Sequence, residues 1–306
     1  MNIKKKYLYG LASVIVLLVV GGILSYHFFL KETPKKAEYL TPEGLMKLPA
    51  REKVKYSEYP YEENENYTIY KTIFESAGSE IHGLLLEPKT EGKAPGVVLL
   101  PGAGVDKVSE LPVARTIANL GYAVHVIDQR GVGETGGRMP SIEEDFLNFQ
   151  NGIIAKWHLP IIDALVGADV LSTRDKVDSS RIILMGESMG GRVAMIAGSI
   201  DSRMKGVLAI SSAGFHYGDG MEEKDRYARS LDADSYVFML SPRPLIMIHS
   251  VWDKTIPINS AAETFEKAKK PKLFVTVNST DCRHGYCEEM LTPLNYSLQA
   301  IAYGGK

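Results

Sequence analysis

The chain has 306 residues, and most of it consists of short apolar runs that alternate with longer amphipathic stretches. The apolar runs are rich in Val, Ile and Leu and contain no regular polar positions, as expected for strands covered on both faces. Strands that alternate with helices predict a mostly parallel sheet with helices on both faces. The predicted strands are Gly96–Leu100, Ala123–Asp128, Arg181–Gly186, Val207–Ser211, Leu245–Ser250 and Lys272–Val277, and the predicted helices are Ser109–Leu120, Ile161–Ser172, Gly190–Ile200 and Ile258–Lys269.

An antiparallel strand pair precedes this pattern, because Tyr67–Phe74 and Ile81–Glu87 flank a glycine turn. Residues 67–306 are therefore assigned to one domain. Two of its connections are longer than usual, residues 141–158 and a small insertion at residues 213–242. Long insertions after strand ends in such a sheet usually shape a site.

One segment between a predicted strand and a predicted helix reads Gly186-Glu187-Ser188-Met189-Gly190. A G-x-S-x-G sequence between a strand and a helix is typical of a nucleophile elbow, a turn that presents a reactive serine. The turn is so tight that a side chain at either glycine would clash with its neighbours. We therefore predict that Ser188 is a nucleophile and that the Met189 N–H, at a helix N-terminus, stabilises a developing oxyanion.

A nucleophilic serine requires a base, and seven histidines are present. His284 is the candidate, because it follows the last predicted strand in a loop that can reach over the serine and is followed by Gly285. The other histidines lie in the N-terminal apolar run, in predicted strands or in the two long connections. Of these, His158 and His216 are weaker candidates for substrate contact.

The base in turn needs an acid that orients it, and Asp253 follows the predicted strand Leu245–Ser250. The chain order Ser188, Asp253, His284 is the order expected for a nucleophile elbow in such a sheet. Asp281 is the competing acid, but it lies three residues before His284 on the same loop. We favour Asp253, with Asp281 as the alternative.

A second oxyanion donor is expected in the loop after an early strand of the sheet. That loop reads Pro101-Gly102-Ala103-Gly104, and its glycines allow the backbone to approach a ligand closely. The Ala103 N–H is the predicted donor, and an ordinary glycine turn is the alternative.

From about Tyr67 to the C-terminus, roughly 240 residues, the chain resembles the α/β-hydrolases, and among them the dienelactone-hydrolase-like and prolyl-oligopeptidase-like serine hydrolases. The matching residues are Ile81-His82-Gly83-Leu84 with Pro88, Asp128-Gln129-Arg130-Gly131-Val132-Gly133, Gly186-Glu187-Ser188-Met189-Gly190-Gly191, Asp253 and His284-Gly285. Three features depart from these families. Dienelactone hydrolases proper use cysteine where this chain has Ser188, Pro101 replaces the histidine of the usual His-Gly oxyanion motif, and no propeller domain fits before Tyr67.

Two further patterns are weaker. Residues 131–136 spell G-x-G-x-x-G, but a dinucleotide site requires a helix to begin at once, and a loop continues here. Cys282 and Cys287 flank His284, and three ligands on one short loop make a poor metal site. The two cysteines either form a disulfide around the base, as an oxidising compartment would allow, or remain free thiols.

Composition excludes several classes of function. With 45% hydrophobic and 24% charged residues, the chain lies near the globular average, which argues against disorder and fibrous folds. The 35 basic residues against 37 acidic ones give no reason to expect a nucleic-acid partner. Two cysteines cannot build a disulfide scaffold or a four-cysteine zinc site, and neither a metal nor an organic cofactor is expected. The oligomeric state stays open.

The N-terminus departs from this average, because Tyr7–Leu30 contains 24 residues without a formal charge. A helix of this length covers about 36 Å, enough for a hydrocarbon core of about 30 Å. The run is longer than the apolar part of an ordinary secretory signal, and residues 26–28 offer no small-residue cleavage site. Residues 1–30 are therefore predicted to be one N-terminal transmembrane helix in the lipid bilayer. A cleaved signal is the alternative.

Residues 31–66 are polar and contain four spread prolines, which predicts an extended stalk between the anchor and the domain. Lysines lie on both sides of the apolar run, so the positive-inside rule does not decide the orientation. A basic N-terminus followed by an apolar run favours a single-pass protein with its catalytic domain outside the cytoplasm.

Together these features predict a membrane-anchored serine hydrolase that cleaves small or medium carboxylic esters by a Ser-His-Asp acyl-enzyme mechanism. Two alternatives remain open: an exopeptidase-like amidase that acts on short peptides, and an inactive hydrolase fold that serves as a binding module.

Overall fold

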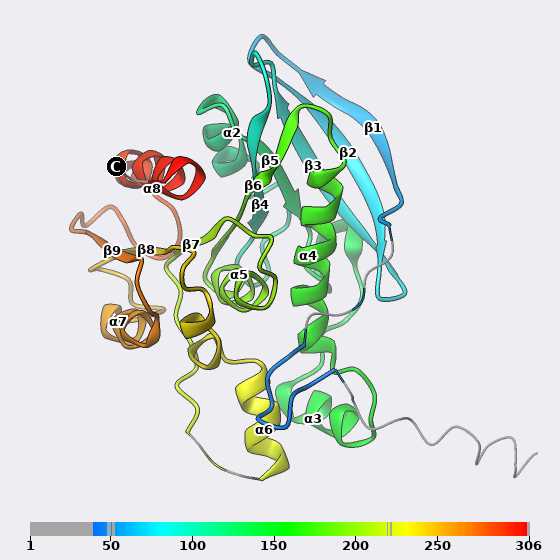
Figure 1. Ribbon diagram of the computed structural model, residues 1–306, viewed down its shortest axis with the longest axis vertical. Helices are drawn as coiled ribbons and strands as arrows, with labels where there is room; N and C mark the ends of the chain where they lie inside the picture. The colour runs from blue at the N-terminus through cyan, green and yellow to red at the C-terminus, as the bar shows by residue number, and fades with distance from the viewer. Residues whose placement is uncertain (1–38, 48–49, 51–52, 219, 221, 305–306) are drawn as a thin grey trace, which may run out of the picture.

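The computed structural model describes residues 39–47, 50, 53–218, 220 and 222–304. Within them the strands form one nine-stranded sheet in the order β1-β2-β3-β5-β4-β6-β7-β8-β9 (Figure 1). The strands from β1 to β5 along this order pair antiparallel, and those from β5 to β9 pair parallel. The strands are β1 (Tyr56–Glu63), β2 (Tyr67–Ser76), β3 (Ser79–Pro88), β4 (Ala94–Leu100), β5 (Ala123–Ile127), β6 (Val177–Glu187), β7 (Gly206–Ile210), β8 (Leu245–Ser250) and β9 (Lys272–Val277).

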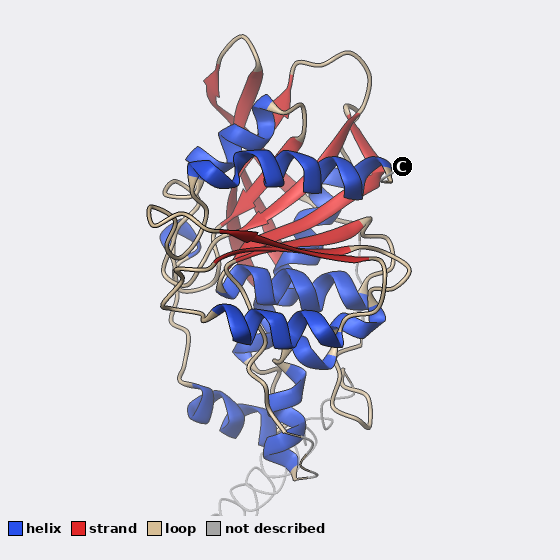
Figure 2. Cartoon of the chain, turned by 90° about the vertical axis from the view of Figure 1, so that its left-hand side faces the viewer, coloured by secondary structure: helices blue, strands red, loops and turns tan. Residues whose placement is uncertain are grey.

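Helices cover both faces of the sheet, and the predicted layered arrangement is confirmed (Figure 2). The central strands β4 to β8 are almost wholly buried, which explains why their sequences are continuously apolar. One face packs against α4, α5 and α7, and the other packs against α2 and α8. The helices are α2 (Leu111–Asn119), α3 (Ile142–Gln150), α4 (Leu159–Ser172), α5 (Met189–Ile200), α6 (Glu223–Ser230), α7 (Ile258–Lys267) and α8 (Leu291–Tyr303).

The two long connections pack together and form a small helical cap, made of α3 and α6 (Figure 1). Phe146 and Phe149 of α3 lie with their ring centroids 5.4 and 5.3 Å from that of Tyr227 on α6. The Tyr227 hydroxyl donates to Asp145, whose buried carboxylate also accepts from the backbone N–H groups of Lys156 and Trp157. The cap is thereby held by apolar and polar contacts between segments far apart in the sequence.

The structure corrects the predicted boundary between stalk and domain. Residues 56–63, assigned to the stalk, form β1, the edge strand that pairs with β2. The polar sequence and Pro60 suggested a linker, but both are tolerated on an edge strand, and the register shifts between Pro60 and Glu62. Earlier still, Leu40 and Met46 are buried against the domain, where the Met46 N–H donates to the Tyr236 hydroxyl.

Within the described part of the chain, no helix combines the length and apolar character needed to cross a bilayer. The predicted anchor, residues 7–30, lies outside the described residues and stays a prediction.

Candidate active site

Ser188 lies in a sharp turn between β6 and α5, at the carboxyl edge of the sheet. Its backbone has φ +50° and ψ −116°, a region that residues other than glycine rarely adopt. Three hydrogen bonds hold this geometry: the Ser188 N–H donates to Ile210 O, and Ser188 O accepts from Ser212 Oγ and the Arg192 N–H. The turn therefore has the form expected of a nucleophile elbow.

The elbow (residues 186–190) crosses so close to neighbouring backbone that its glycines leave no room for side chains. A Cβ on Gly190 would overlap the carbonyl oxygens of Leu100 and Pro101, and a Cβ on Gly186 would overlap the backbone of Gly190. The close crossing places Ser188 directly beside the end of β4. A Cβ on Gly102 would lie only 3.6 Å from the Ser188 Cβ.

His284 and Asp253 meet in the structure, although 31 residues separate them in the sequence. His284 Nδ1 lies 2.8 Å from Asp253 Oδ2. The other oxygen, Oδ1, accepts from the N–H groups of Thr255 and Ile256, each at 2.9 Å. The Asp253 side chain is fully buried, and the imidazole is 27% exposed, so one histidine edge is held by the acid while the other is open to a reactant. The competing Asp281 is exposed on the surface.

The base loop (residues 278–287), which carries His284, contacts the elbow directly. Glu187 Oε2 accepts from the Tyr286 N–H at 2.9 Å, and Ser211 Oγ donates to Gly285 O at 3.5 Å. In the described part of the chain, no hydrogen bond joins Ser188 Oγ to His284 Nε2. Contacts of this kind often form only when substrate binds.

The oxyanion loop (residues 101–110) lies beside Ser188 and is held by a buried ion pair. The Lys107 backbone N–H donates to Asp128 Oδ1 at 2.7 Å, while Lys107 Nζ lies 2.6 Å from Asp128 Oδ2 and 2.7 Å from Glu134 Oε2. Ala103, the predicted oxyanion donor, is exposed near the start of this loop. Sequence reasoning did not identify Lys107, which has no motif of its own, whereas Asp128 belongs to the matching residues of the resemblance.

The G-x-G-x-x-G segment, residues 131–136, helps to hold the oxyanion loop. Gly133–Thr135 forms a short 3-10 helix, and the Glu134 N–H donates to Asp128 Oδ2. The segment thus packs against the carboxylate that holds Lys107, and the long helix that a dinucleotide site needs does not begin here.

Cys282 and Cys287 form a disulfide that closes a short loop around His284, with their Cα atoms 5.5 Å apart. Ser250 Oγ donates to Cys282 O at 2.7 Å and ties this loop to the end of β8, next to Asp253. The two sulfurs and the Glu289 carboxylate lie close together, but cysteines bonded to each other cannot bind a metal as thiolates.

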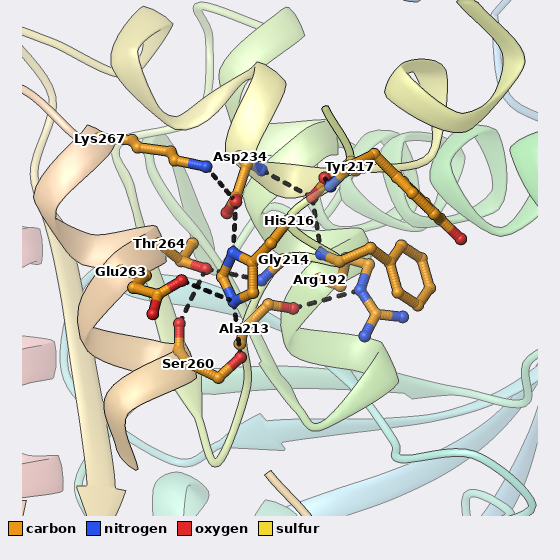
Figure 3. A network of polar contacts seen from close by, with 12 residues as sticks. Arg192, Ala213, Gly214, His216, Tyr217, Asp234, Ser260, Glu263, Thr264 and Lys267 are labelled. Carbon is orange, nitrogen blue, oxygen red and sulfur yellow. Dashed lines mark hydrogen bonds and ion pairs between the residues drawn. The ribbon is translucent and has the colours of Figure 1, made fainter. Parts of the chain in front are cut away.

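His216, a weaker candidate in the sequence, is fully engaged in a polar network (Figure 3). Its Nδ1 lies 2.6 Å from Asp234 Oδ2, and its Nε2 lies 2.6 Å from Ser260 Oγ. Asp234 is also paired with Lys267 on α7. Although this row has the composition of a triad, it joins the loop after β7 to α7, and both imidazole nitrogens are occupied.

His158 is buried beneath the cap, where its Nε2 lies 2.6 Å from Ser230 Oγ. Burial lowers its pKa to about 3, so the imidazole is neutral. His249 is also buried, its pKa lies below the usual value because of desolvation, and its Nε2 donates to Ile256 O at 2.8 Å. The same nitrogen lies 3.6 Å from Asp253 Oδ2, so His249 packs against the loop that carries the acid.

A cavity of about 30 Å³ lies beside the elbow and is almost wholly apolar. Met189 and Arg192 line it from α5. The Arg192 Cζ lies 3.6 Å from the Phe215 ring centroid. The Arg192 Nε donates to Ala213 O (Figure 3). The remaining wall comes from the segment after β5, from α3, α4 and α5, and from the two long connections: Gln129, Ile142, Trp157, Pro160, Ile161, Val193, Ile196, Phe215 and Leu231.

The close packing at Gly190 predicts that a side chain there will destabilise the fold. Gly190→Ala should lower the free energy of unfolding by about 3 kcal/mol or more, because the new methyl group must displace the backbone at Leu100 and Pro101. Gly218→Ala is the matched control, since a Cβ there has open space around it, and its stability should change by less than about 0.5 kcal/mol. Urea unfolding measures both, and equal stabilities for the two variants would contradict the geometry.

The sequence of the chain is similar to those of several known proteins. The profile of the alpha/beta hydrolase fold matches residues 95–269. The curated protein of Bacillus subtilis (strain 168) named "Putative hydrolase YtaP" is 25% identical over 262 residues, which covers 77% of this chain and 86% of that protein. The "Uncharacterized protein YfhR" of Escherichia coli O157:H7 is 24% identical over 208 residues, which covers 62% of this chain and 65% of that protein.

Among solved structures, an acetyl xylan esterase from Paenibacillus sp. R4 superimposes with a TM-score of 0.68 at 20% identity, covering 81% of this chain and 89% of that one. An acylaminoacyl peptidase superimposes with a TM-score of 0.57 at 17% identity over 77% of this chain and 41% of that one. These likenesses concern the fold. With the matched profile, the mostly parallel sheet and the strand–turn–helix at Ser188, the chain belongs to the α/β-hydrolase family, and it is a hydrolase of that fold.

Proposed function

We propose that this protein is a serine esterase that hydrolyses short-chain carboxylic esters through an acyl-enzyme. The observation that carries the proposal is the 2.8 Å contact between His284 and Asp253, on a loop bonded to the residue before Ser188. A serine in a strained elbow, a base beside it and a buried acid behind the base are the parts that acyl transfer needs.

In the first step Ser188 Oγ attacks the ester carbonyl carbon while its proton passes to His284 Nε2. The carbon–oxygen bond to the alcohol then breaks, and His284 returns the proton to the leaving alcohol. Water attacks the acyl-enzyme in the second step, again with His284 as base, and releases the acid and free serine. Asp253 holds the imidazole tautomer through Nδ1 and stabilises the imidazolium that forms twice per cycle.

Charge develops on the carbonyl oxygen in both steps and requires hydrogen-bond donors. The Met189 N–H is suited to this role, because the first N–H groups of a helix have no partner within the helix. The Ala103 N–H is the second proposed donor, on the loop that lies against Ser188. A well-placed donor of this kind contributes about 3 kcal/mol to transition-state stabilisation.

The cavity beside Met189 supports a short acyl group. Its volume of about 30 Å³ is comparable to one small group, and its walls are apolar. The acetyl xylan esterase among the structural neighbours has a name that agrees with a small acyl group, while the acylaminoacyl peptidase keeps a peptidase as the second candidate.

The location of the enzyme is part of the proposal. The uncharged run at residues 7–30 would hold it on a bilayer, with the domain outside the cytoplasm. The Cys282–Cys287 disulfide supports an oxidising compartment, since cytosolic thiols are kept reduced.

The first test is labelling and turnover by a chain that starts at Lys31. A fluorophosphonate should label the wild type and Ser199→Ala, a control on the same helix, but not Ser188→Ala. p-Nitrophenyl acetate should be hydrolysed at least about 10-fold faster than the octanoate, because longer chains overfill the cavity. Labelling that persists in Ser188→Ala would contradict the proposal. Hydrolysis of aminoacyl nitroanilides, with no hydrolysis of esters, would support the peptidase.

A pair of substitutions decides between the two candidate acids. Asp253→Asn should lower kcat about 10³- to 10⁴-fold, because an amide cannot hold the required tautomer or stabilise imidazolium. Asp281→Asn should retain kcat within about twofold, since that carboxylate is exposed and contacts no part of the triad. The reverse pattern in steady-state kinetics would identify Asp281 as the acid.

The position of the disulfide around His284 predicts that a thiol reductant will lower activity. Reduction of Cys282–Cys287 frees the loop that carries the base, and misplacement by about 1 Å costs up to about 100-fold in rate. A thiol reductant should therefore lower kcat, and a Cys282→Ser/Cys287→Ser variant should be slow from the start and insensitive to reductant. Unchanged activity in a protein with two titratable thiols would contradict this role.

A further inference from the structure

Two buried glutamates that the mechanism does not use lie in contact behind the site. Glu110 is 5% exposed and Glu187 is 9% exposed, and their two carboxyl groups are neighbours in the interior. Glu110 occupies the N-cap position of α2, yet its side chain does not cap that helix. Oε1 of each residue is buried, and no N–H group, hydroxyl or ammonium group of the described residues donates a hydrogen bond to it.

Two carboxyl groups can bond to each other only when one of them carries a proton. Two adjacent buried carboxylates would repel each other, with little solvent to screen the repulsion. Burial and the neighbouring Glu187 raise the pKa of Glu110 to about 9. The Tyr286 N–H and the nearby His284 charge favour the ionised form of Glu187, although burial still raises its pKa. Glu110 is therefore the donor and Glu187 the acceptor.

The pair connects three segments that must keep a fixed spacing. Glu110 ends the oxyanion loop, Glu187 is the residue before Ser188, and Glu187 Oε2 accepts from the Tyr286 N–H in the base loop. Gly285 packs against the same oxygen, because a Cβ at that position would lie 2.8 Å from Glu187 Oε2. Among the hydrogen bonds of the described residues, the bond from the Tyr286 N–H to Glu187 Oε2 is the one that joins the base loop to the elbow.

We propose that Glu110 and Glu187 share one proton at neutral pH, and that this bonded carboxyl pair positions the base loop so that His284 faces Ser188. The inference rests on the proposed function of Ser188 and His284. Both glutamates are positioning residues, since they act through Tyr286 and the loop.

The pair also ties activity and stability to pH. The titratable groups that face it are His284 and the Tyr286 phenol, both from the base loop. The pKa of Glu110 is higher in the folded chain than in the unfolded one, so the folded state binds the extra proton between pH 4.5 and about 9. The stability that this proton contributes is therefore fully present below pH 4.5 and is lost as the pH rises to about 9, where the pair also loses its hydrogen bond.

The test compares Glu110→Gln, which donates a hydrogen bond at every pH, with Glu110→Leu, which cannot donate; Glu91→Gln in an exposed loop is the control. Wild-type kcat/KM should fall above about pH 9. Glu110→Gln should keep neutral kcat within about threefold and move this fall upward by at least about one pH unit. Glu110→Leu should lose at least about 10-fold in kcat with KM nearly unchanged.

A readout without substrate separates this inference from the proposed function. At pH 7.5 the wild type should show an infrared C=O band of a protonated carboxylic acid that Glu110→Gln lacks, and the melting temperature of Glu110→Gln should fall less between pH 5 and 9. Absence of the band overturns the shared proton. If the band is present but kcat/KM falls at the same alkaline pH in the wild type and in Glu110→Gln, the positioning role is overturned. If no variant hydrolyses any ester, the proposed function fails while the band still decides the pair.

Discussion

The close crossing of the elbow and the end of β4 is the constraint on which the site depends. Gly190 lies so near Leu100 O that the first turn of α5 and the oxyanion loop cannot move independently. The same turn forces Ser188 to φ +50°, a conformation that three hydrogen bonds to its backbone maintain. The strained backbone of Ser188 thus fixes the position of its hydroxyl. The other parts of the site are arranged around that position.

Around this fixed point the chain uses buried charges to hold loops. Lys107 and Asp128 hold the oxyanion loop, and Asp253 holds the base and its own turn. Buried ion pairs add little net stability, because desolvation offsets most of the attraction, but they select one geometry strongly once formed. The Glu110–Glu187 pair follows the same rule with a proton in place of a cation. These buried groups therefore define the positions of the loops more than they stabilise the fold.

Much of this architecture could be predicted from the sequence, because its signals are local. Continuous apolar strands such as Val207–Ser211, and the pentapeptide around Ser188, act within a few residues, so periodicity and turn chemistry identify them. The edge strand β1 was missed because its polar residues and Pro60 are allowed only by its place at the sheet edge. Helix α8, whose apolar face packs on β6 and β7, was missed as well.

The contacts of several other polar residues in the site could not be predicted, because they depend on tertiary structure. Nothing local to Lys107, Glu110 or Glu187 shows that each will be buried against a group far along the chain. The pairing of Cys282 with Cys287 was open for a related reason. Spacing allowed a bridge, but only the closed loop around His284 shows which groups that bridge would hold.

The cap shows where selectivity of the proposed esterase would arise. The charged residues at the start of α6 bond to one another: Glu222 and Asp225 form the capping box of this helix, and Lys224 pairs with Glu222 on the surface. The side of the insertion that faces α5 is apolar, with Phe215 stacked on Arg192 and Leu231 beside them. A longer acyl chain would not fit the cavity of about 30 Å³ unless it displaced these packed side chains. The small size of the cavity, and not the charge of the cap, would therefore discriminate between substrates.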